Sequence, residues 1–222
     1  IDGDHVFSYR EIWEASLKFG SALTSLGITK GDRVGILSPN CAEFVISFYG
    51  ISRIGAVVTT INSGYRELEI SHQISDSQCS VIIVQEDLLE TLEKALSLSQ
   101  LKPTVITLGS DGSEFWNLIE AAHLTEKEIE IDPRNDLAAL PYSSGTTGLS
   151  KGVMLSHFNL VSNVQQLVGL SGKAKLMHED IVLVHLPLFH IYGMNVLMNG
   201  CIAVGATQVM MGRFDMVEFL DL

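Results

Sequence analysis

The chain has 222 residues, a formal net charge of −12, 46% hydrophobic residues and 18% charged residues. This composition is typical of a globular protein with a sizeable buried core and excludes a disordered chain. The acidic balance argues against a basic face for nucleic acid, so we expect small-molecule ligands instead.

Three cysteines, Cys41, Cys79 and Cys201, are far apart and lie in apolar surroundings. Their odd number and the lack of Cys-x-x-Cys spacing predict free thiols in a reducing compartment. No signal peptide is visible, and because the chain begins at Ile1 we expect that a true N-terminus is missing. Polar residues and glycines interrupt the apolar stretch 196–211, which therefore predicts a core helix and strand and no membrane span.

Helical and strand patterns alternate through residues 1–124. Ser8 and Glu11 predict a capping box, which opens a helix that ends at Gly27. The predicted strands that follow are 33–37, 56–61, 81–84 and 105–108. The predicted helices between and after them are 42–53, 67–77, 88–98 and 115–122. Continuous apolar strands between helices predict an α/β fold of layered, mostly parallel sheets flanked by helices, with ligands at the carboxyl ends of the strands.

Residues 125–136 are polar and acidic, and we expect them to form a surface connection between two halves of the fold, 1–124 and 137–222. In the second half, periodicity predicts two helices and two strands before a last helix that starts at Asp215. The predicted helices are 159–170 and 192–204, and the predicted strands are 181–186 and 207–211.

The most informative motif is the run SSGTTGLSKG at residues 143–152. Small side chains let backbone N–H groups turn toward an anion, glycine allows positive φ, and Lys151 adds a positive charge. A solvated Ser/Gly/Thr loop has a similar composition. The apolar segments on both sides and the fixed offset of Lys151 favour a polyphosphate-binding loop, although the pattern is neither a Walker loop nor a dinucleotide fingerprint.

This run resembles the phosphate-binding signature of the adenylate-forming (AMP-binding) superfamily, which comprises acyl- and aryl-CoA synthetases, luciferases and peptide-synthetase adenylation domains. Ser150 stands where the family usually has proline. The resemblance implies a catalytic role for Lys151 and an ATP site that also takes Mg²⁺. The implied ATP-binding residues are Ser143, Ser144, Gly145, Thr146, Thr147, Gly148 and Lys151.

A second motif, FHIYGMNV, occupies residues 189–196. By itself His190 could be an ordinary buried histidine in a core turn. Beside the first motif, the segment resembles the aromatic–histidine motif of the CoA-synthetase and luciferase branch, and it is similar to 4-coumarate–CoA ligase-like proteins. The resemblance implies that His190 is catalytic and lies near the reacting carboxylate, and that Tyr192, Gly193 and Val196 also bind the substrate.

Two positions depart from that family, which has alanine where Gly193 stands and typically serine where Val196 stands. Loss of the hydroxyl favours an apolar acyl chain over a phenolic acid. Helical spacings of three and four also predict that Tyr192, Asn195, Val196 and Asn199 share one face.

Arg213 matches a basic family position that contacts coenzyme A, but it is equally explained as a solvated arginine at a strand end. The scattered histidines His157, His178 and His185 have no ligand spacing, so no metal site is predicted among them.

The resemblance covers the whole chain, but the chain covers less than half of a family member. It therefore implies a partial N-terminal adenylation domain, residues 1–222, without the C-terminal domain. We expect activity in the full-length parent and none in this fragment alone. The implied activity is that of an ATP-dependent acid–CoA ligase, which converts a fatty or aryl carboxylic acid through an acyl-adenylate into a thioester, with coenzyme A as co-substrate.

Two alternatives stay open, namely a luciferase-like or peptide-synthetase adenylating enzyme and a non-catalytic nucleotide-binding homologue. We expect a cytoplasmic location, with a peroxisomal one as the alternative. The individual acid and the oligomeric state are not predicted.

Overall fold

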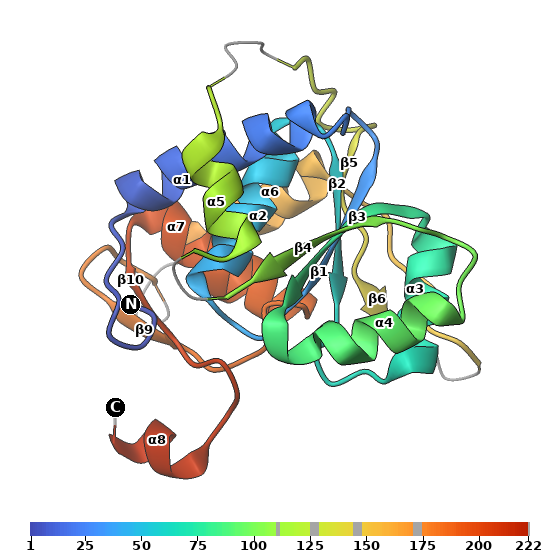
Figure 1. Ribbon diagram of the computed structural model, residues 1–222. Coiled ribbons are helices and arrows are strands. Elements are labelled where there is room, and N and C mark those ends of the chain that lie inside the picture. The colour runs from blue at the N-terminus through green and yellow to red at the C-terminus, as the bar shows by residue number, and fades with distance from the viewer. Residues whose placement is uncertain (110–111, 125–128, 144–147, 171–174, 222) are drawn as a thin grey trace.

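The computed structural model describes residues 1–109, 112–124, 129–143, 148–170 and 175–221. At its centre lies a six-stranded sheet with the strand order β4-β3-β1-β2-β5-β8 (Figure 1). Neighbouring strands are parallel except for the antiparallel pair β5 and β8. The predicted α/β class is therefore confirmed. The strands are β1 (Arg33–Leu37), β2 (Val57–Ile61), β3 (Cys79–Gln85), β4 (Thr104–Leu108), β5 (Leu137–Ala139) and β8 (Leu155–Ser156).

Alternate side chains of the central strands belong to two separate apolar clusters, one on each face of the sheet. Ile36 and Ile83 pack into the cluster on one face of the sheet, whereas their neighbours Leu37 and Val84 pack into the cluster on the other. Because successive strand residues point to opposite faces, a strand covered on both sides must be apolar throughout. All five residues of β2 are buried, as this argument requires.

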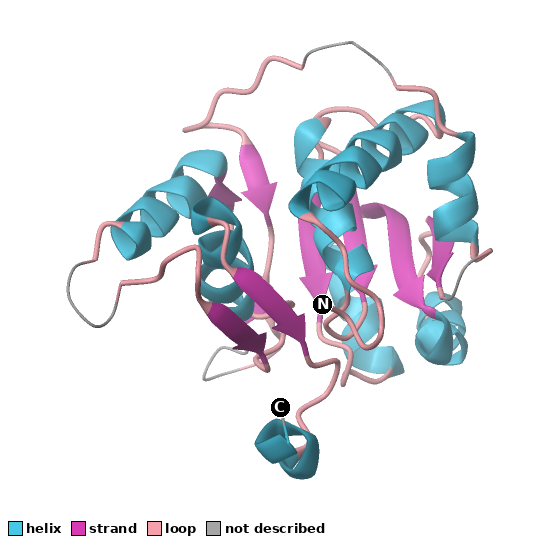
Figure 2. Ribbon diagram, turned by 90° about the vertical axis from the view of Figure 1, so that its left-hand side faces the viewer, coloured by secondary structure: helices cyan, strands magenta, loops and turns pink. Residues whose placement is uncertain are grey.

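Helices cover both faces of the sheet (Figures 1 and 2). The first face carries α1 (Tyr9–Ser25), α2 (Ala42–Arg53) and α5 (Glu114–Ala121), and the second carries α3 (Glu67–Ser77) and α4 (Leu89–Ser97), which follows a 3₁₀ turn at Glu86–Leu88.

The start of α1 and its crossing with α2 both follow from individual residues. Ser8 and Glu11 form the predicted capping box, with the Ser8 amide donating to the Glu11 carboxylate at 2.7 Å. Glycine is required where the helices cross, because a Cβ on Gly20 would lie 2.8 Å from the carbonyl oxygen of Gly50. The helix α2 has no cap from its own N-cap residue, and the carboxylate of Asp2 instead accepts from the Ala42 amide at 2.9 Å.

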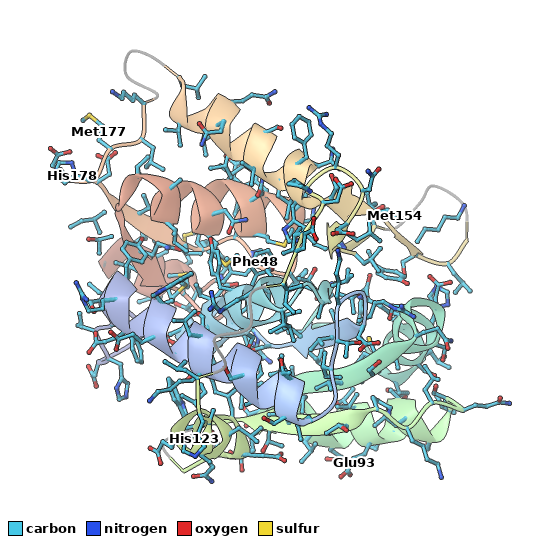
Figure 3. The ribbon with its side chains drawn as sticks, turned by 90° about the horizontal axis from the view of Figure 1, so that it is seen from above. Phe48, Glu93, His123, Met154, Met177 and His178 are labelled. Carbon is cyan, nitrogen blue, oxygen red and sulfur yellow. The ribbon has the colours of Figure 1, made fainter. Side chains whose placement is uncertain are left out.

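The second half of the chain contributes strands to the central sheet and also forms smaller sheets beside it (Figure 2). Strands β9 (Ile181–Val184) and β10 (Thr207–Met210) form a parallel pair. The helices of this half are α6 (His157–Val168), a π-helix (Tyr192–Asn199), α7 (Gly200–Val204) and α8 (Met216–Asp221). Figure 3 shows Phe48 of α2 in the interior beside these helices, with Met154 and His178 at the periphery.

The prediction of one regular helix over 192–204 is wrong in its first part. Residues 192–199 form a π-helix, whose i→i+5 hydrogen bonds place side chains differently from an α-helix. Spacings of three and four therefore no longer define one face, and Tyr192 is 50% exposed while Asn195 is only 2% exposed. The remaining predicted helices and strands agree with the structure to within two residues at each end.

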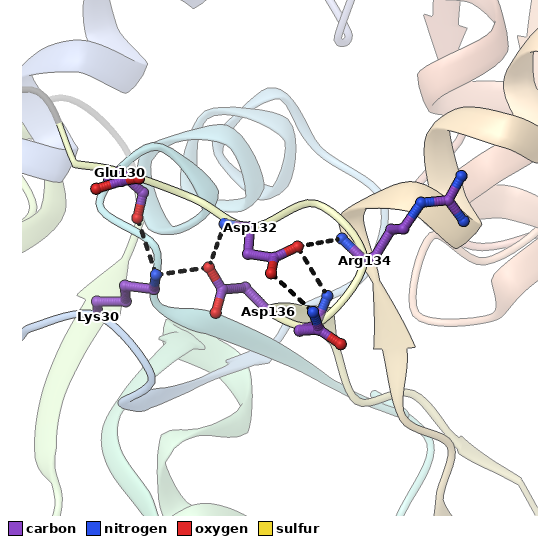
Figure 4. Close-up of polar contacts among 6 residues, drawn as sticks. Lys30, Glu130, Asp132, Arg134 and Asp136 are labelled. Carbon is purple, nitrogen blue, oxygen red and sulfur yellow. Dashed lines mark hydrogen bonds and ion pairs between the residues drawn. The ribbon is translucent and has the colours of Figure 1, made fainter.

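The described part of the connection, residues 129–136, contains no helix or strand and is anchored by polar contacts (Figure 4). The Lys30 ammonium lies 2.6 Å from the Asp136 carboxylate and donates to the Glu130 carbonyl at 2.8 Å. The Asp132 carboxylate accepts from the Arg134 amide at 3.0 Å. These contacts hold the connection against the turn that precedes β1.

The predicted free thiols are confirmed for Cys41, Cys79 and Cys201, none of which forms a disulfide. Burial raises the pKa of Cys79 and of Cys201 to about 11 each. Within the described ranges, no helix is both long enough and apolar enough to cross a membrane.

Candidate functional site

The predicted phosphate-binding loop connects two short antiparallel strands, β6 (Tyr142–Ser143) and β7 (Lys151–Gly152). Ser143 pairs with Lys151, so the first and last predicted residues of the loop lie opposite each other. Gly148 has φ 97°, the left-handed conformation that the prediction assigned to a loop glycine. Four other predicted residues, Ser144, Gly145, Thr146 and Thr147, lie outside the described residues.

Helix α3 holds this hairpin in place. The Tyr142 hydroxyl donates to the Asp76 carboxylate, and the His72 imidazole lies 2.8 Å from the Ser150 carbonyl oxygen. A Cβ on Gly152 would approach the Tyr142 ring to 3.1 Å, so the hairpin closes tightly around this ring. Burial, together with the neighbouring Asp76 carboxylate, raises the pKa of Tyr142 and keeps its hydroxyl a neutral donor.

A cavity of about 180 Å³ brings the two predicted motifs together. Ser143 of the hairpin and His190 of the second motif both line it. The remaining wall comes from the end of β2, from the loop that follows β2, from α3, and from the neighbours Tyr142 and Phe189. This places the cavity at the carboxyl end of a central parallel strand, where ligands bind in open α/β sheets. The lining residues are Thr60, Asn62, Tyr65, Gln73, Tyr142, Ser143, Phe189 and His190.

The turn after β9 orients the imidazole of His190. The His190 amide donates to the Pro187 carbonyl at 3.1 Å, and the Tyr192 amide donates to His190 Nδ1 at 3.3 Å. Because Nδ1 accepts a hydrogen bond, a neutral imidazole carries its proton on Nε2. His190 can therefore present an N–H donor to an anionic group in the cavity.

The other predicted substrate residues do not line this cavity. A Cβ on Gly193 would lie 2.1 Å from the Pro187 carbonyl oxygen, so glycine is required there to seat the π-helix. Tyr192 is half exposed and Val196 is half-buried. Lys151 is exposed at the rim of the hairpin, and Arg213 is exposed beyond β10, outside the cavity.

Several residues of this region carry no sequence motif and were not predicted. Gln73 is fully buried on α3, and the Thr59 and Thr60 hydroxyls at the end of β2 are buried with it. The one available signal was a glutamine on a helical face otherwise formed by apolar residues such as Ile70 and Ile74. In the described ranges, no three His, Cys, Asp or Glu side chains are grouped so that they could hold a metal ion.

Comparison with known proteins identifies the family of the chain. The model of the AMP-binding enzyme family matches residues 1–222. The chain is 37% identical to 4-coumarate–CoA ligase 2 of Solanum tuberosum over 226 aligned residues, which cover 100% of this chain and 41% of that protein.

The fold of the chain also resembles solved structures. The long-chain-fatty-acid–CoA ligase of Archaeoglobus fulgidus superposes with a TM-score of 0.86 at 30% identity, covering 97% of this chain and 44% of that one. ATP-bound MatB from Rhodopseudomonas palustris superposes with a TM-score of 0.84 at 29% identity, covering 96% of this chain and 42% of that one.

The chain thus spans less than half the length of these relatives. Within that span, the family match extends from the first residue to the last. It includes the parallel sheet, the hairpin at 142–152 and the turn that carries His190. The chain belongs to the AMP-binding enzyme family.

Proposed function

We propose that the polypeptide containing this chain is an ATP-dependent acid–CoA ligase. The observation that carries the proposal is the cavity at the end of β2, in which the phosphate-loop hairpin and His190 meet. The similarity to a 4-coumarate–CoA ligase and to a fatty-acid–CoA ligase supports this class of reaction.

The reaction makes an unreactive carboxylate electrophilic. A carboxylate oxygen attacks the α-phosphorus of ATP, and the bond to the leaving pyrophosphate breaks to give an acyl-adenylate. The thiol of coenzyme A then attacks the acyl carbon, the thioester forms, and AMP leaves with the electron pair of the broken C–O bond. The protein must align the attacking and leaving oxygens and stabilise the charge on the phosphate.

The described residues suit these tasks. Lys151 stands at the rim of the hairpin, where its ammonium can reach a phosphate, and Ser143 adds donors at the cavity wall. His190 can donate its Nε2–H to the carboxylate of the acid and so hold it for attack. Mg²⁺ would arrive with the phosphates of ATP and neutralise part of their charge, and residues 144–147 would complete the loop around them.

We also propose which part of the domain each segment of the chain forms. Residues 1–124 would form the first α/β half, 125–136 the connection, and 137–222 the half that carries the phosphate loop and the acyl pocket. β5 and β8 belong to the second half, yet they complete the sheet of the first. We assign Arg213 to coenzyme A, because it is exposed at the end of β10 and carries a positive charge on an acidic chain.

The test is pyrophosphate release by the complete polypeptide with a panel of fatty and aromatic acids. We expect acid-dependent release and a faster release of AMP when coenzyme A is added. Acid-dependent pyrophosphate release with no effect of coenzyme A would instead indicate a luciferase-like or peptide-synthetase enzyme. ATP binding without pyrophosphate exchange for any acid would indicate a non-catalytic homologue.

A further inference from the structure

One buried glutamine contacts the end of β2 at two points. Gln73 is 0% exposed, lines the cavity, and donates both hydrogens of Nε2, one to Thr59 Oγ1 at 2.9 Å and one to the Thr60 carbonyl at 3.0 Å. This amide orientation is fixed by chemistry, because the Thr60 carbonyl can only accept and the Thr59 hydroxyl already donates to the Leu140 carbonyl at 2.9 Å. Gln73 Oε1 has no hydrogen-bond partner among the described residues.

The same two threonines hold the two functional motifs. The Thr59 hydroxyl bonds to Leu140, which leads directly into the hairpin at Tyr142–Ser143. The Thr60 hydroxyl donates to the Phe189 carbonyl at 2.7 Å, next to His190. The Gln73 side chain of α3 therefore contacts Thr59 and Thr60, and these two threonines in turn hydrogen-bond to the segments that lead into the hairpin and into the turn of His190.

We propose that Gln73 is a positioning residue for adenylation, and that it acts through Thr59 and Thr60 to set the spacing between Ser143 and His190. The side chains of Gln73, Thr59 and Thr60 are called the Gln73 clamp. They are between 0% and 2% exposed, so water does not compete for their hydrogen bonds. Hydrogen bonds are stronger in a buried setting than in water, and small displacements of reacting groups have large effects on rate. The inference rests on the proposed function.

The first experiment measures adenylation by the complete polypeptide in four variants. Gln73→Leu removes the clamp donors, Thr59→Val and Thr60→Val each remove one hydroxyl without a change of shape, and Ser75→Ala is the control. Ser75 lies on the same helix and bonds to Ser99 at 3.0 Å, away from the cavity. We expect Gln73→Leu to lower kcat by about tenfold or more at saturating ATP and acid. Thr60→Val should mainly raise KM for the acid and Thr59→Val mainly KM for ATP.

A fifth variant separates hydrogen bonding from packing. Gln73→Glu keeps the shape but has no donor when ionised, so it should be as slow as Gln73→Leu at pH 8. At lower pH the protonated carboxyl can donate to the Thr60 carbonyl, and its activity relative to the unmodified enzyme should rise. A relative activity that stays as low as that of Gln73→Leu when the carboxyl is protonated would mean that the donor is irrelevant, and it would overturn the proposal.

Amide hydrogen exchange on the 222-residue chain tests the clamp without any activity. Gln73→Leu should speed exchange at Leu140 and His190, and Ser75→Ala should not. Equal exchange in these two variants, or equal kcat in the first experiment, would refute the clamp. Absence of pyrophosphate release from the unmodified polypeptide would refute the proposed function instead, and the exchange measurement would then decide the clamp alone.

Discussion

At the scale of single residues, the candidate site combines one positive charge with one oriented imidazole. Lys151 is exposed at the hairpin, and among the described residues it makes no ion pair. His190 is held by its own amide and by the Tyr192 amide. Neither side chain contributes to a core, so both can be replaced with little effect on folding.

The replacement Lys151→Ala should slow adenylation by about tenfold to a hundredfold in the complete polypeptide, because a charge-assisted hydrogen bond to phosphate contributes about 1.5–3 kcal/mol. The urea midpoint of the 222-residue chain should stay unchanged. Lys94→Ala, which removes an exposed lysine on α4, is the matched control. Full activity of Lys151→Ala would contradict the proposal that residues 143–152 bind the phosphates of ATP.

The side chain at position 196 is expected to influence which acid is used. Val196 offers a methyl surface where the family resemblance implies a serine hydroxyl, and an unmet phenolic hydroxyl costs about 1–3 kcal/mol. A buried methylene contributes about 0.8 kcal/mol, so apolar chains are favoured. We expect fatty acids or apolar aryl acids to outperform 4-coumarate, and Val196→Ser to shift the ratio toward 4-coumarate.

The measurement is kcat/KM for hexanoate, a longer fatty acid, cinnamate and 4-coumarate with both proteins. A preference of the unmodified enzyme for 4-coumarate over cinnamate by about tenfold, which corresponds to about 1.4 kcal/mol, would contradict the argument. The half-buried setting of Val196 in the π-helix allows the substitution without a large cavity.

At the scale of elements, helix α2 carries an acid whose environment opposes ionisation. Burial raises the pKa of Glu43, and the Trp116 indole donates to its carboxylate at 3.2 Å. Because the pKa is higher in the folded state, Glu43 contributes stability at low pH that is lost as the pH rises through the folded pKa.

The variant Glu43→Gln should therefore raise the urea midpoint at pH 7 and lose this advantage as the pH falls through the folded pKa, so that none remains below about 4.3, the pKa of an ordinary glutamate. Glutamine keeps an acceptor for the Trp116 N–H and removes the charge. Urea unfolding followed by circular dichroism from pH 4 to pH 8 gives the result, with Glu93→Gln on the exposed surface of α4 as the control. Parallel pH profiles for Glu43→Gln and the unmodified chain would show that Glu43 is ionised at no cost.

At the scale of the whole molecule, the sheet is shared between the two halves of the chain. β5 and β8 pair beside β2, and the Leu140 amide donates to the Val58 carbonyl at 2.7 Å. The backbone nitrogen of Ile1 adds a second link, because it donates to the Gln208 carbonyl at 2.7 Å. The two halves should therefore unfold together.

We predict that the 222-residue chain by itself does not form acyl-CoA, because it spans only 41% of its relative from Solanum tuberosum. Weak ATP binding should remain if the hairpin folds on the sheet. Thioester formation from acid, ATP and coenzyme A, followed by chromatography, measures turnover, and the complete polypeptide is the positive control. Robust turnover by the chain alone would contradict the view that the site needs further segments.

Sequence patterns predicted most of the elements because those patterns are local. The capping box of Ser8 and Glu11, the apolar runs of the central strands and the helical periodicity each act within a few residues. The short strands β5 to β8 were missed, since two or three residues are too few for a pattern. The π-helix was also missed, because it depends on the packing of Gly193 against Pro187.

The α/β class, the family and the two motifs could all be predicted from the sequence, because apolar periodicity and glycine-rich loops are local properties of the chain. The shared cavity of Ser143 and His190, and the link that Gln73 makes between their supports, became visible in the folded structure. These contacts join residues far apart in sequence, and a buried glutamine differs from a solvated one only in what surrounds it. Long-range packing therefore decides which polar residues serve the site.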